Sequence, residues 1–101
     1  FEPLVQGAGG MRIYSTDILN ALMAIAKRHE VVTIADEVMT GFYRTGKFFA
    51  SDYLDHHPDI FCMSKGLTGG FMPMGITSVS KRVVASFDSK EYTRTFWHGH
   101  S

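Results

Sequence analysis

The chain of 101 residues carries ten basic and ten acidic residues, and this balance excludes the electrostatic attraction on which binding to nucleic acid or to an anionic membrane depends. An apolar content of 45% is normal for a globular core and argues against disorder, so we expect a single domain. No apolar stretch reaches the roughly 20 residues of a membrane-spanning helix, and the single cysteine, Cys62, favours a reducing, cytoplasmic location.

The first part of the chain predicts a strand, a turn, a helix and a second strand. Residues 1–6 read as the tail of a strand, and residues 7–11 form a turn with three glycines. Residues 15–30 have helical periodicity and begin with a Ser-Thr pair that can cap the helix. The β-branched run of residues 31–36 predicts a buried strand. The apolar stripe of the helix consists of Ile18, Leu19, Leu22, Met23, Ile25 and Ala26.

The rest of the chain continues the alternation of apolar strands with loops and short helices. In chain order we expect a glycine-punctuated loop at 40–47, a weak helical turn at 48–57, buried strands at 59–65 and 76–80 separated by a glycine-rich turn at 66–75, a short helix at 81–87 and the start of another strand at 94–99. Strands that alternate with helices indicate an α/β fold with a mostly parallel sheet flanked by helices.

The two ends of the chain predict that it is part of a longer protein. It begins at Phe1 without an initiator methionine, and it closes on an aromatic and polar cluster, residues 96–101. Such a cluster is unlike the frayed terminus of a complete domain. We therefore expect residues 1–101 to be one central segment of a larger domain, with both flanks missing.

The adjacent acids Asp36 and Glu37 stand where a predicted strand ends, and two kinds of ligand would suit them. The first is a nucleotide-bound magnesium ion, because residues 41–47 imitate a phosphate-binding loop. That loop, however, continues with Phe48 where a serine or threonine is needed, and it follows the acidic strand instead of preceding it. The second kind of ligand is the protonated ring nitrogen of an organic cofactor.

The two histidine pairs are weak evidence for a metal site. His98 and His100 would share one face of a strand, but no acid or cysteine nearby in sequence completes a tetrahedral set. His56 and His57 read as an exposed helix end before Pro58. The sequence therefore predicts no metal.

The position of Lys65 favours the organic cofactor over the magnesium ion. Lys65 follows the apolar run IFCMS (60–64), so it should emerge at the carboxyl end of a buried strand, where α/β sheets bind ligands. Desolvation there would make its amine a nucleophile toward an aldehyde. Asp36 ends the preceding strand and could reach the same edge of the sheet. An acid for a pyridine nitrogen and a lysine for an aldehyde are the groups that pyridoxal 5'-phosphate requires, with Val38 as an apolar contact to the ring.

These residues resemble a known family. The sequences DEVMTGFYRTG (36–46) and PDIFCMSKGLTGG (58–70) are similar to the central block of the class III, fold-type I, pyridoxal-phosphate aminotransferases, and the resemblance covers nearly the whole chain. It implies that the chain is part of the large cofactor-binding domain. It also implies that Asp36 binds the pyridine nitrogen, that Val38 packs on the ring and that Lys65 forms the internal aldimine. Glu2 matches an acid that lies near the active site, whereas Glu37 has no assigned chemistry and is expected to serve the structure.

The last residues match a segment that, in this family, reaches into the active site of the partner subunit of a homodimer. The resemblance implies that Ser101 binds the cofactor phosphate through its hydroxyl, that His100 lies beside it and that Gly99 faces the substrate. The family often has Pro-Thr where His100 and Ser101 stand, and it usually has Gly where Tyr43 stands. If that glycine has a left-handed backbone, a tyrosine is disfavoured there.

Within the class, VQGAGGM (5–11), LTGG (67–70) and HGHS (98–101) look most like the 8-amino-7-oxononanoate aminotransferases of biotin biosynthesis, and Met39 stands where several other branches carry Gln. This resemblance implies conversion of 8-amino-7-oxononanoate to 7,8-diaminononanoate, with S-adenosylmethionine or, in a rarer branch, lysine as amino donor. Lys65 would move the proton between Cα and the cofactor, and Asp36 would keep the ring an electron sink. The alternatives are another class III transaminase, of the ω-amino acid or ornithine type, and an inactive fragment. The fragment would lack a phosphate-binding turn, a ring-stacking aromatic and a carboxylate-binding arginine.

Overall fold

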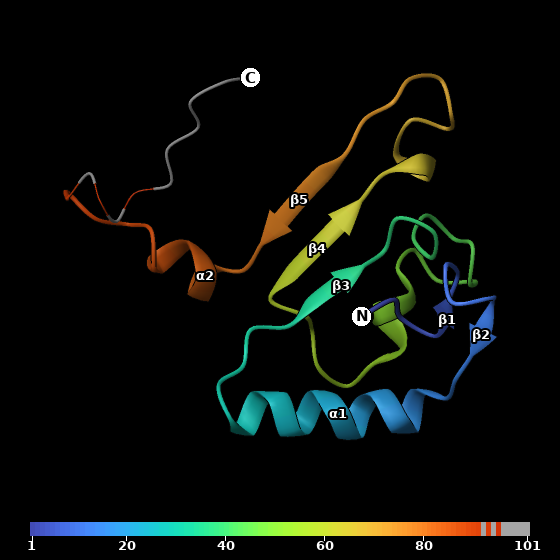
Figure 1. Cartoon of the computed structure of the whole chain (residues 1–101), viewed down its shortest axis with the longest axis horizontal. Coiled ribbons are helices and arrows are strands. Elements are labelled where there is room, and N and C mark those ends of the chain that lie inside the picture. Colours follow the sequence, from blue (N-terminus) through green and yellow to red (C-terminus); the bar gives the residue numbers. More distant parts are fainter. Residues whose placement is uncertain (92, 94, 96–101) are drawn as a thin grey trace.

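The computed structural model describes residues 1–91, 93 and 95 as short strands and two helices around a small sheet (Figure 1). The elements are β1 (Val5–Gln6), β2 (Arg12–Ile13), α1 (Thr16–Arg28), β3 (Ile34–Asp36), the 3-10 turn η1 (Ala50–Tyr53), β4 (Ile60–Met63), the 3-10 turn η2 (Lys65–Leu67), β5 (Ile76–Val79) and α2 (Lys81–Ala85). The predicted strand at 94–99 falls outside the described residues.

The main sheet has the order β3-β4-β5. β3 and β4 are parallel, with Asp36 opposite Cys62, and β4 and β5 are antiparallel, with Met63 opposite Ile76. The backbone of Phe1 extends this sheet, because its N–H donates to Ile34 at 2.9 Å and its carbonyl accepts from Asp36 at 2.8 Å. The other paired strands, β1 and β2, form a two-stranded antiparallel ribbon that the sequence did not predict.

The α/β class is confirmed, but the described part of the sheet is mixed where the sequence predicted mostly parallel pairing. β3 and β4 are joined by a long connection that contains η1, and this length lets the chain return and run parallel. The connection from β4 to β5 contains only the three-residue turn η2. A connection without an element that can cross back over the sheet joins antiparallel neighbours.

Helix α1 begins at the predicted cap. The Oγ atom of Ser15 accepts a hydrogen bond from the backbone N–H of Ile18 at 3.5 Å. Asp17 lies in the first turn, and Lys27 and Arg28 lie in the last, so each charge suits the end of the helix dipole near it.

The hydrophobic core lies between α1 and the segment that follows η1. Leu19 and Met23 of the helix pack with Leu54, and Leu4 and Tyr14 cover this cluster. The other large residues of the predicted stripe are about half exposed: Ile18, Leu22 and Ile25. Only part of the amphipathic face is therefore covered by the described residues.

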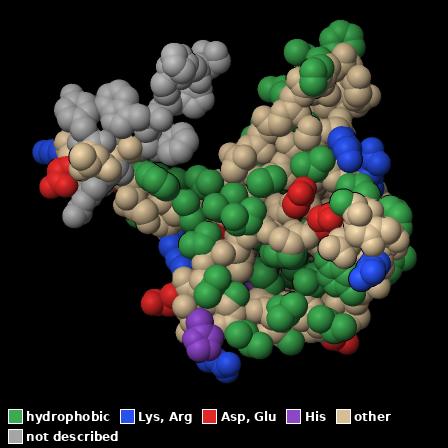
Figure 2. All heavy atoms as spheres, viewed as in Figure 1, with side chains coloured by type: hydrophobic (Ala, Val, Ile, Leu, Met, Phe, Trp, Pro, Cys, Tyr) green, Lys and Arg blue, Asp and Glu red, His purple; other side chains and the backbone are tan. Residues whose placement is uncertain are grey.

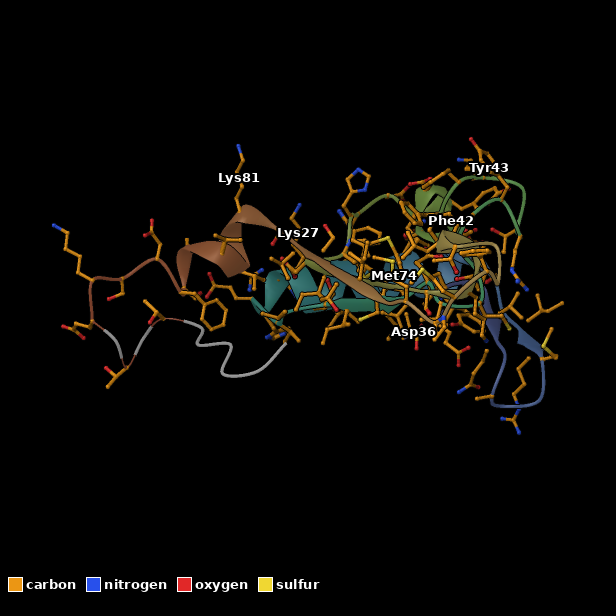
Figure 3. All side chains as sticks on the ribbon, turned by 90° about the horizontal axis from the view of Figure 1, so that it is seen from above. Lys27, Asp36, Phe42, Tyr43, Met74 and Lys81 are labelled. Carbon is orange, nitrogen blue, oxygen red and sulfur yellow. The ribbon has the colours of Figure 1, made fainter. Side chains whose placement is uncertain are left out.

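The prediction that the strands are buried is wrong for the chain as described. Ala35 is buried, but both of its neighbours in β3 are exposed, and so is every residue of β5. The reason is that α1 lies beside the sheet and not across its face (Figures 1 and 3). Figure 2 accordingly shows hydrophobic side chains gathered over the strands and along α1. Among the described helices none combines the length and the apolar character needed to cross a membrane.

Candidate active site

The parallel pairing of β3 and β4 brings Asp36 and Lys65 to the same edge of the sheet. Asp36 is the last residue of β3, and Lys65 follows β4 after a single residue. Both side chains line one open cavity of about 320 Å³, together with Glu2, Gly7, Ala8, Val38 and Met39. Four residues that the sequence singled out (Glu2, Asp36, Val38 and Lys65) therefore meet at one place. Gly99, His100 and Ser101 lie outside the described residues.

Asp36 presents an exposed carboxylate to this cavity. Its Oδ1 atom accepts a hydrogen bond from the backbone N–H of Val38 at 3.0 Å, which turns the side chain back over the start of the next loop. The other oxygen has no hydrogen bond within the described part of the chain and can receive one from a ligand. Figure 3 shows Asp36 on the opposite face of the chain from Phe42 and Tyr43.

Lys65 leaves the strand in an unusual way. Its φ of 44° is in the left-handed region, which is uncommon for a residue with a side chain. The turn is closed by a hydrogen bond from Leu67 N to Ser64 O at 3.0 Å, and Ser64 Oγ donates to Met74 O at 2.6 Å. Lys65 is exposed, so the desolvation that the sequence predicted for it is not provided by the described residues.

The segment before β2 contributes Glu2, Gly7 and Ala8 to the walls of the cavity. Oε2 of Glu2 accepts a hydrogen bond from the backbone N–H of Gly7 at 2.8 Å. A Cβ atom on Gly7 would lie 2.4 Å from Sδ of Met39, so the glycine allows the turn to pack directly on this side chain. Burial raises the pKa of Tyr14, and the negative charge of Glu2 raises it further.

Glu37 behaves differently from its neighbour Asp36. Its side chain is completely buried, and its carboxylate accepts four hydrogen bonds. Oε1 accepts from the backbone N–H and the hydroxyl of Ser51 at 2.7 and 2.6 Å. Oε2 accepts from Thr40 Oγ1 at 2.6 Å and from Ala50 N at 3.1 Å. This buried, fully hydrogen-bonded environment agrees with the sequence-based expectation that Glu37 serves the structure beside the site.

A second cavity, of about 310 Å³, lies beside the first and was missed by the sequence reasoning. It is lined by Val5, Met11, Met39, Thr40, Arg44 and Thr45, and Met39 belongs to both cavities. Its walls are mainly apolar, and Arg44 supplies a positive charge that has no carboxylate partner within the described residues. In the sequence, Arg44 belongs to the imitation of a phosphate-binding loop and to the segment that resembles the family, and neither pattern predicts that its side chain lines a cavity.

The first cavity suits the reactive end of pyridoxal phosphate. The free oxygen of Asp36 can pair with a protonated ring nitrogen, the amine of Lys65 can bond to an aldehyde, and Val38 offers an apolar wall for the ring. Among residues 1–91, 93 and 95 no cluster of His, Cys, Asp and Glu side chains could hold a metal ion.

Comparison with known proteins agrees with this chemistry. The profile of the class-III aminotransferase family matches residues 1–99, and the chain belongs to this family. Over 100 residues it is 50% identical to an adenosylmethionine-8-amino-7-oxononanoate aminotransferase of Synechococcus elongatus, with 99% of this chain and 24% of that protein covered. The enzyme of the same name from Staphylococcus aureus is 42% identical over 101 residues, with 99% of this chain and 22% of that protein covered.

Solved structures show the same fold. An aminotransferase of Bacillus anthracis superposes with a TM-score of 0.88 at 35% identity, covering 97% of this chain and 22% of that one. An (S)-enantioselective omega-transaminase of Thermomicrobium roseum gives a TM-score of 0.81 at 37% identity, covering 97% of this chain and 22% of that one. The chain thus spans roughly a fifth to a quarter of the length of the proteins that it matches.

Proposed function

We propose that this chain is the central segment of the large domain of a pyridoxal-phosphate-dependent aminotransferase. The observation that carries the proposal is the shared cavity of Asp36 and Lys65 at the ends of two adjacent parallel strands. The full-length protein would transfer an amino group to 8-amino-7-oxononanoate in biotin biosynthesis, giving 7,8-diaminononanoate. Support for this substrate comes from the names of two relatives that are 50% and 42% identical to the chain.

Each residue of the cavity has a separate task in this proposal. When bound, pyridoxal phosphate supplies an aldehyde and an electron-withdrawing ring. Lys65 holds the aldehyde through Nζ, and its free amine later moves the proton at the substrate Cα. Asp36 keeps the proton on the ring nitrogen, and Val38 packs on the ring. Glu2 lines the same cavity and lies near the site of the reaction in this proposal.

The cavity of Arg44 suits the other end of the substrate. 8-Amino-7-oxononanoate is a long polymethylene chain with a carboxylate at one end. Because Met39 borders both cavities, a chain that starts beside Lys65 can pass over this apolar side chain toward Arg44. The guanidinium is suited to pair with a carboxylate in two parallel hydrogen bonds. The proposal thus differs from the sequence-based expectation, which placed the carboxylate-binding arginine outside this chain.

The remaining parts of the proposal concern residues and partners outside the described chain. Ser101 and His100 would bind the cofactor phosphate, and Gly99 would face the substrate in the site of the other subunit of a cytoplasmic homodimer. S-adenosylmethionine is the proposed amino donor, because it is part of the name of the relatives, and lysine is the alternative.

A second candidate is a class-III transaminase with another amine substrate. It is favoured by the similarity to the omega-transaminase of Thermomicrobium roseum and to a taurine:2-oxoglutarate aminotransferase of Bifidobacterium kashiwanohense, which has a TM-score of 0.77 at 38% identity and covers 84% of this chain and 19% of that one.

The experiment is an assay of the full-length protein with 8-amino-7-oxononanoate and S-adenosylmethionine, in parallel with taurine and ω-amino acids. Turnover of the first pair supports the primary proposal, and turnover only of the others supports the second candidate. In the same assay Lys65→Ala is expected to abolish both activity and the visible absorbance of the lysine-bound cofactor. If the variant kept both, the proposed role of Lys65 would be wrong.

A further inference from the structure

The carboxylates of Asp36 and Glu37 leave the end of β3 in opposite directions, as successive side chains of a strand do. Asp36 is exposed in the first cavity, whereas the carboxylate of Glu37 is completely buried. A charge with no access to water is stable only where hydrogen bonds replace its hydration. Glu37 has that replacement in full, since each of its oxygens accepts two hydrogen bonds.

The donors to Glu37 lie at the two ends of one loop, residues 38–49. Thr40 lies near its start, and Ala50 and Ser51 follow its end. The loop is also held at its start by a hydrogen bond from Gly41 N to Glu37 O at 2.9 Å, where a Cβ on the glycine would lie 2.8 Å from that oxygen. One buried side chain therefore closes the loop against the end of β3.

This loop supplies walls to both cavities. Val38 and Met39 line the cavity of Lys65, and Met39, Thr40, Arg44 and Thr45 line the neighbouring one. The distance between the charge of Asp36 and that of Arg44 is therefore set by the same loop that Glu37 closes.

No other side chain can make this set of hydrogen bonds. In a glutamine one of the two oxygens is replaced by an NH2 group, which is a donor. In one orientation of the amide this group would face the backbone N–H of Ala50, and in the other that of Ser51. The hydroxyls of Thr40 and Ser51 can rotate to accept, but a backbone N–H cannot. An aspartate is one methylene shorter and would not reach the same donors.

We propose that Glu37 is a positioning residue for the transamination, which fixes the loop that joins the Lys65 cavity to the Arg44 cavity. The proposal rests on the function proposed above. If Glu37 only supported the fold, its replacement would lower the unfolding temperature and leave binding in the folded protein unchanged. A positioning role requires that binding weakens in protein that is still folded.

The test compares Glu37→Gln with Asp59→Asn in the full-length protein. Asp59 is a matched control because its carboxylate also accepts from a backbone N–H and a hydroxyl, those of Thr33 at 3.0 and 3.1 Å. It precedes β4, whereas Lys65 follows that strand, and it lines neither of the two cavities. Three quantities are measured: the unfolding temperature, the dissociation constant of pyridoxal phosphate without substrate, and KM and kcat for 8-amino-7-oxononanoate.

Both variants are expected to unfold at a lower temperature than the wild type. Only Glu37→Gln should also raise the cofactor dissociation constant and KM, each by about tenfold, which corresponds to the free energy of roughly one hydrogen bond to a charged group. The proposal is overturned if Glu37→Gln resembles Asp59→Asn, with a lower unfolding temperature but unchanged binding.

Ser51→Ala keeps the comparison informative if Glu37→Gln does not fold. It removes one hydroxyl donor and leaves the carboxylate and its other donors in place. A smaller rise of the cofactor dissociation constant and KM supports the proposal, and unchanged values overturn it. If the wild-type protein binds the cofactor but does not convert 8-amino-7-oxononanoate, the proposed function is wrong. The role of Glu37 is still decided in that case by the cofactor dissociation constants of the variants.

Discussion

Gly66 lies directly against Phe42: a Cβ atom on the glycine would come within 2.8 Å of Cβ of Phe42. Gly66 follows Lys65 in the turn after β4, and Phe42 belongs to the loop after β3. Phe42 in turn packs edge-to-face on Phe48 and Phe49, with ring centroids 5.3 and 6.0 Å away. The aromatic cluster of Phe42, Phe48 and Phe49 thus limits the position of the backbone at Lys65 and Gly66.

Gly66→Ala is expected to displace this backbone, because neither Cβ atom belongs to the flexible end of a side chain. Overpacking of this kind costs about 1–3 kcal/mol of stability. In the full-length protein we expect a lower unfolding temperature and weaker binding of pyridoxal phosphate, measured by cofactor absorbance in a titration. Gly75→Ala is the control, since its Cβ would meet only Met63 O, at 3.6 Å. Equal behaviour of the two variants would show that the contact with Phe42 does not constrain Lys65.

The backbone of Tyr43 predicts an order of stability among variants. Its φ is 66°, the left-handed conformation that the sequence reasoning considered for this position, and its side chain is largely exposed. Tyr43→Gly and Tyr43→Ala both remove the ring and its contact with Phe48. They differ chiefly in backbone preference, so the glycine variant should be more stable by about 1 kcal/mol. Denaturant unfolding of the full-length variants measures this difference, and an alanine variant of equal or greater stability would contradict it.

The position of Asp36 and Lys65 at one edge of the sheet could be predicted from sequence because it depends on local signals. Each residue stands at the end of a short apolar run, and the ends of adjacent parallel strands meet at one edge of a sheet. The antiparallel return of β5 was not predicted, because apolar periodicity gives the type of an element and not the direction of its pairing.

The contacts around the site could not be predicted, because they join residues that are distant in sequence. The hydrogen bonds from Ala50 and Ser51 to Glu37 connect residues 13 and 14 positions apart, and no local pattern marks them. The left-handed backbone of Lys65 is imposed by the turn around it and has no signature in a lysine. The cavity of Arg44 is also lined by Val5 and Met11, which lie near the start of the chain.

Asp59 predicts a dependence of stability on pH. Hydrogen bonding from the backbone N–H of Thr33 lowers the pKa of Asp59 from its usual 3.8, and this outweighs the opposing effect of burial; the Thr33 and Ser80 hydroxyls and the charge of Arg82 lower it further. Because the folded pKa lies below the unfolded one, the ionised carboxylate stabilises the fold above the unfolded value, and this contribution is lost as the pH falls through the folded pKa.

Asp59→Asn should therefore be less stable than the wild type by about 1.5–3 kcal/mol at pH 7, the range for hydrogen bonds to a charged group. The difference should shrink as the pH falls below the usual pKa of 3.8. Unfolding temperatures of both full-length proteins, measured from neutral to acidic pH, test this. A difference that is constant over the whole range would show that the charge of Asp59 does not contribute.

Asp36→Asn removes the charge at the end of β3 and keeps the size and shape of the side chain, so it tests the charge alone. An asparagine can still accept the hydrogen bond from the backbone N–H of Val38, so the loop that follows should keep its position. The amide has no charge to hold a proton on the ring nitrogen of the cofactor. We expect the visible absorbance of the lysine-bound cofactor to persist in the full-length variant, while kcat falls by about 100-fold or more, the scale of losing one electrostatic contact in an active site. A variant with near-normal kcat would show that Asp36 is not the partner of the ring nitrogen, and loss of cofactor absorbance would show that the carboxylate is needed for binding itself.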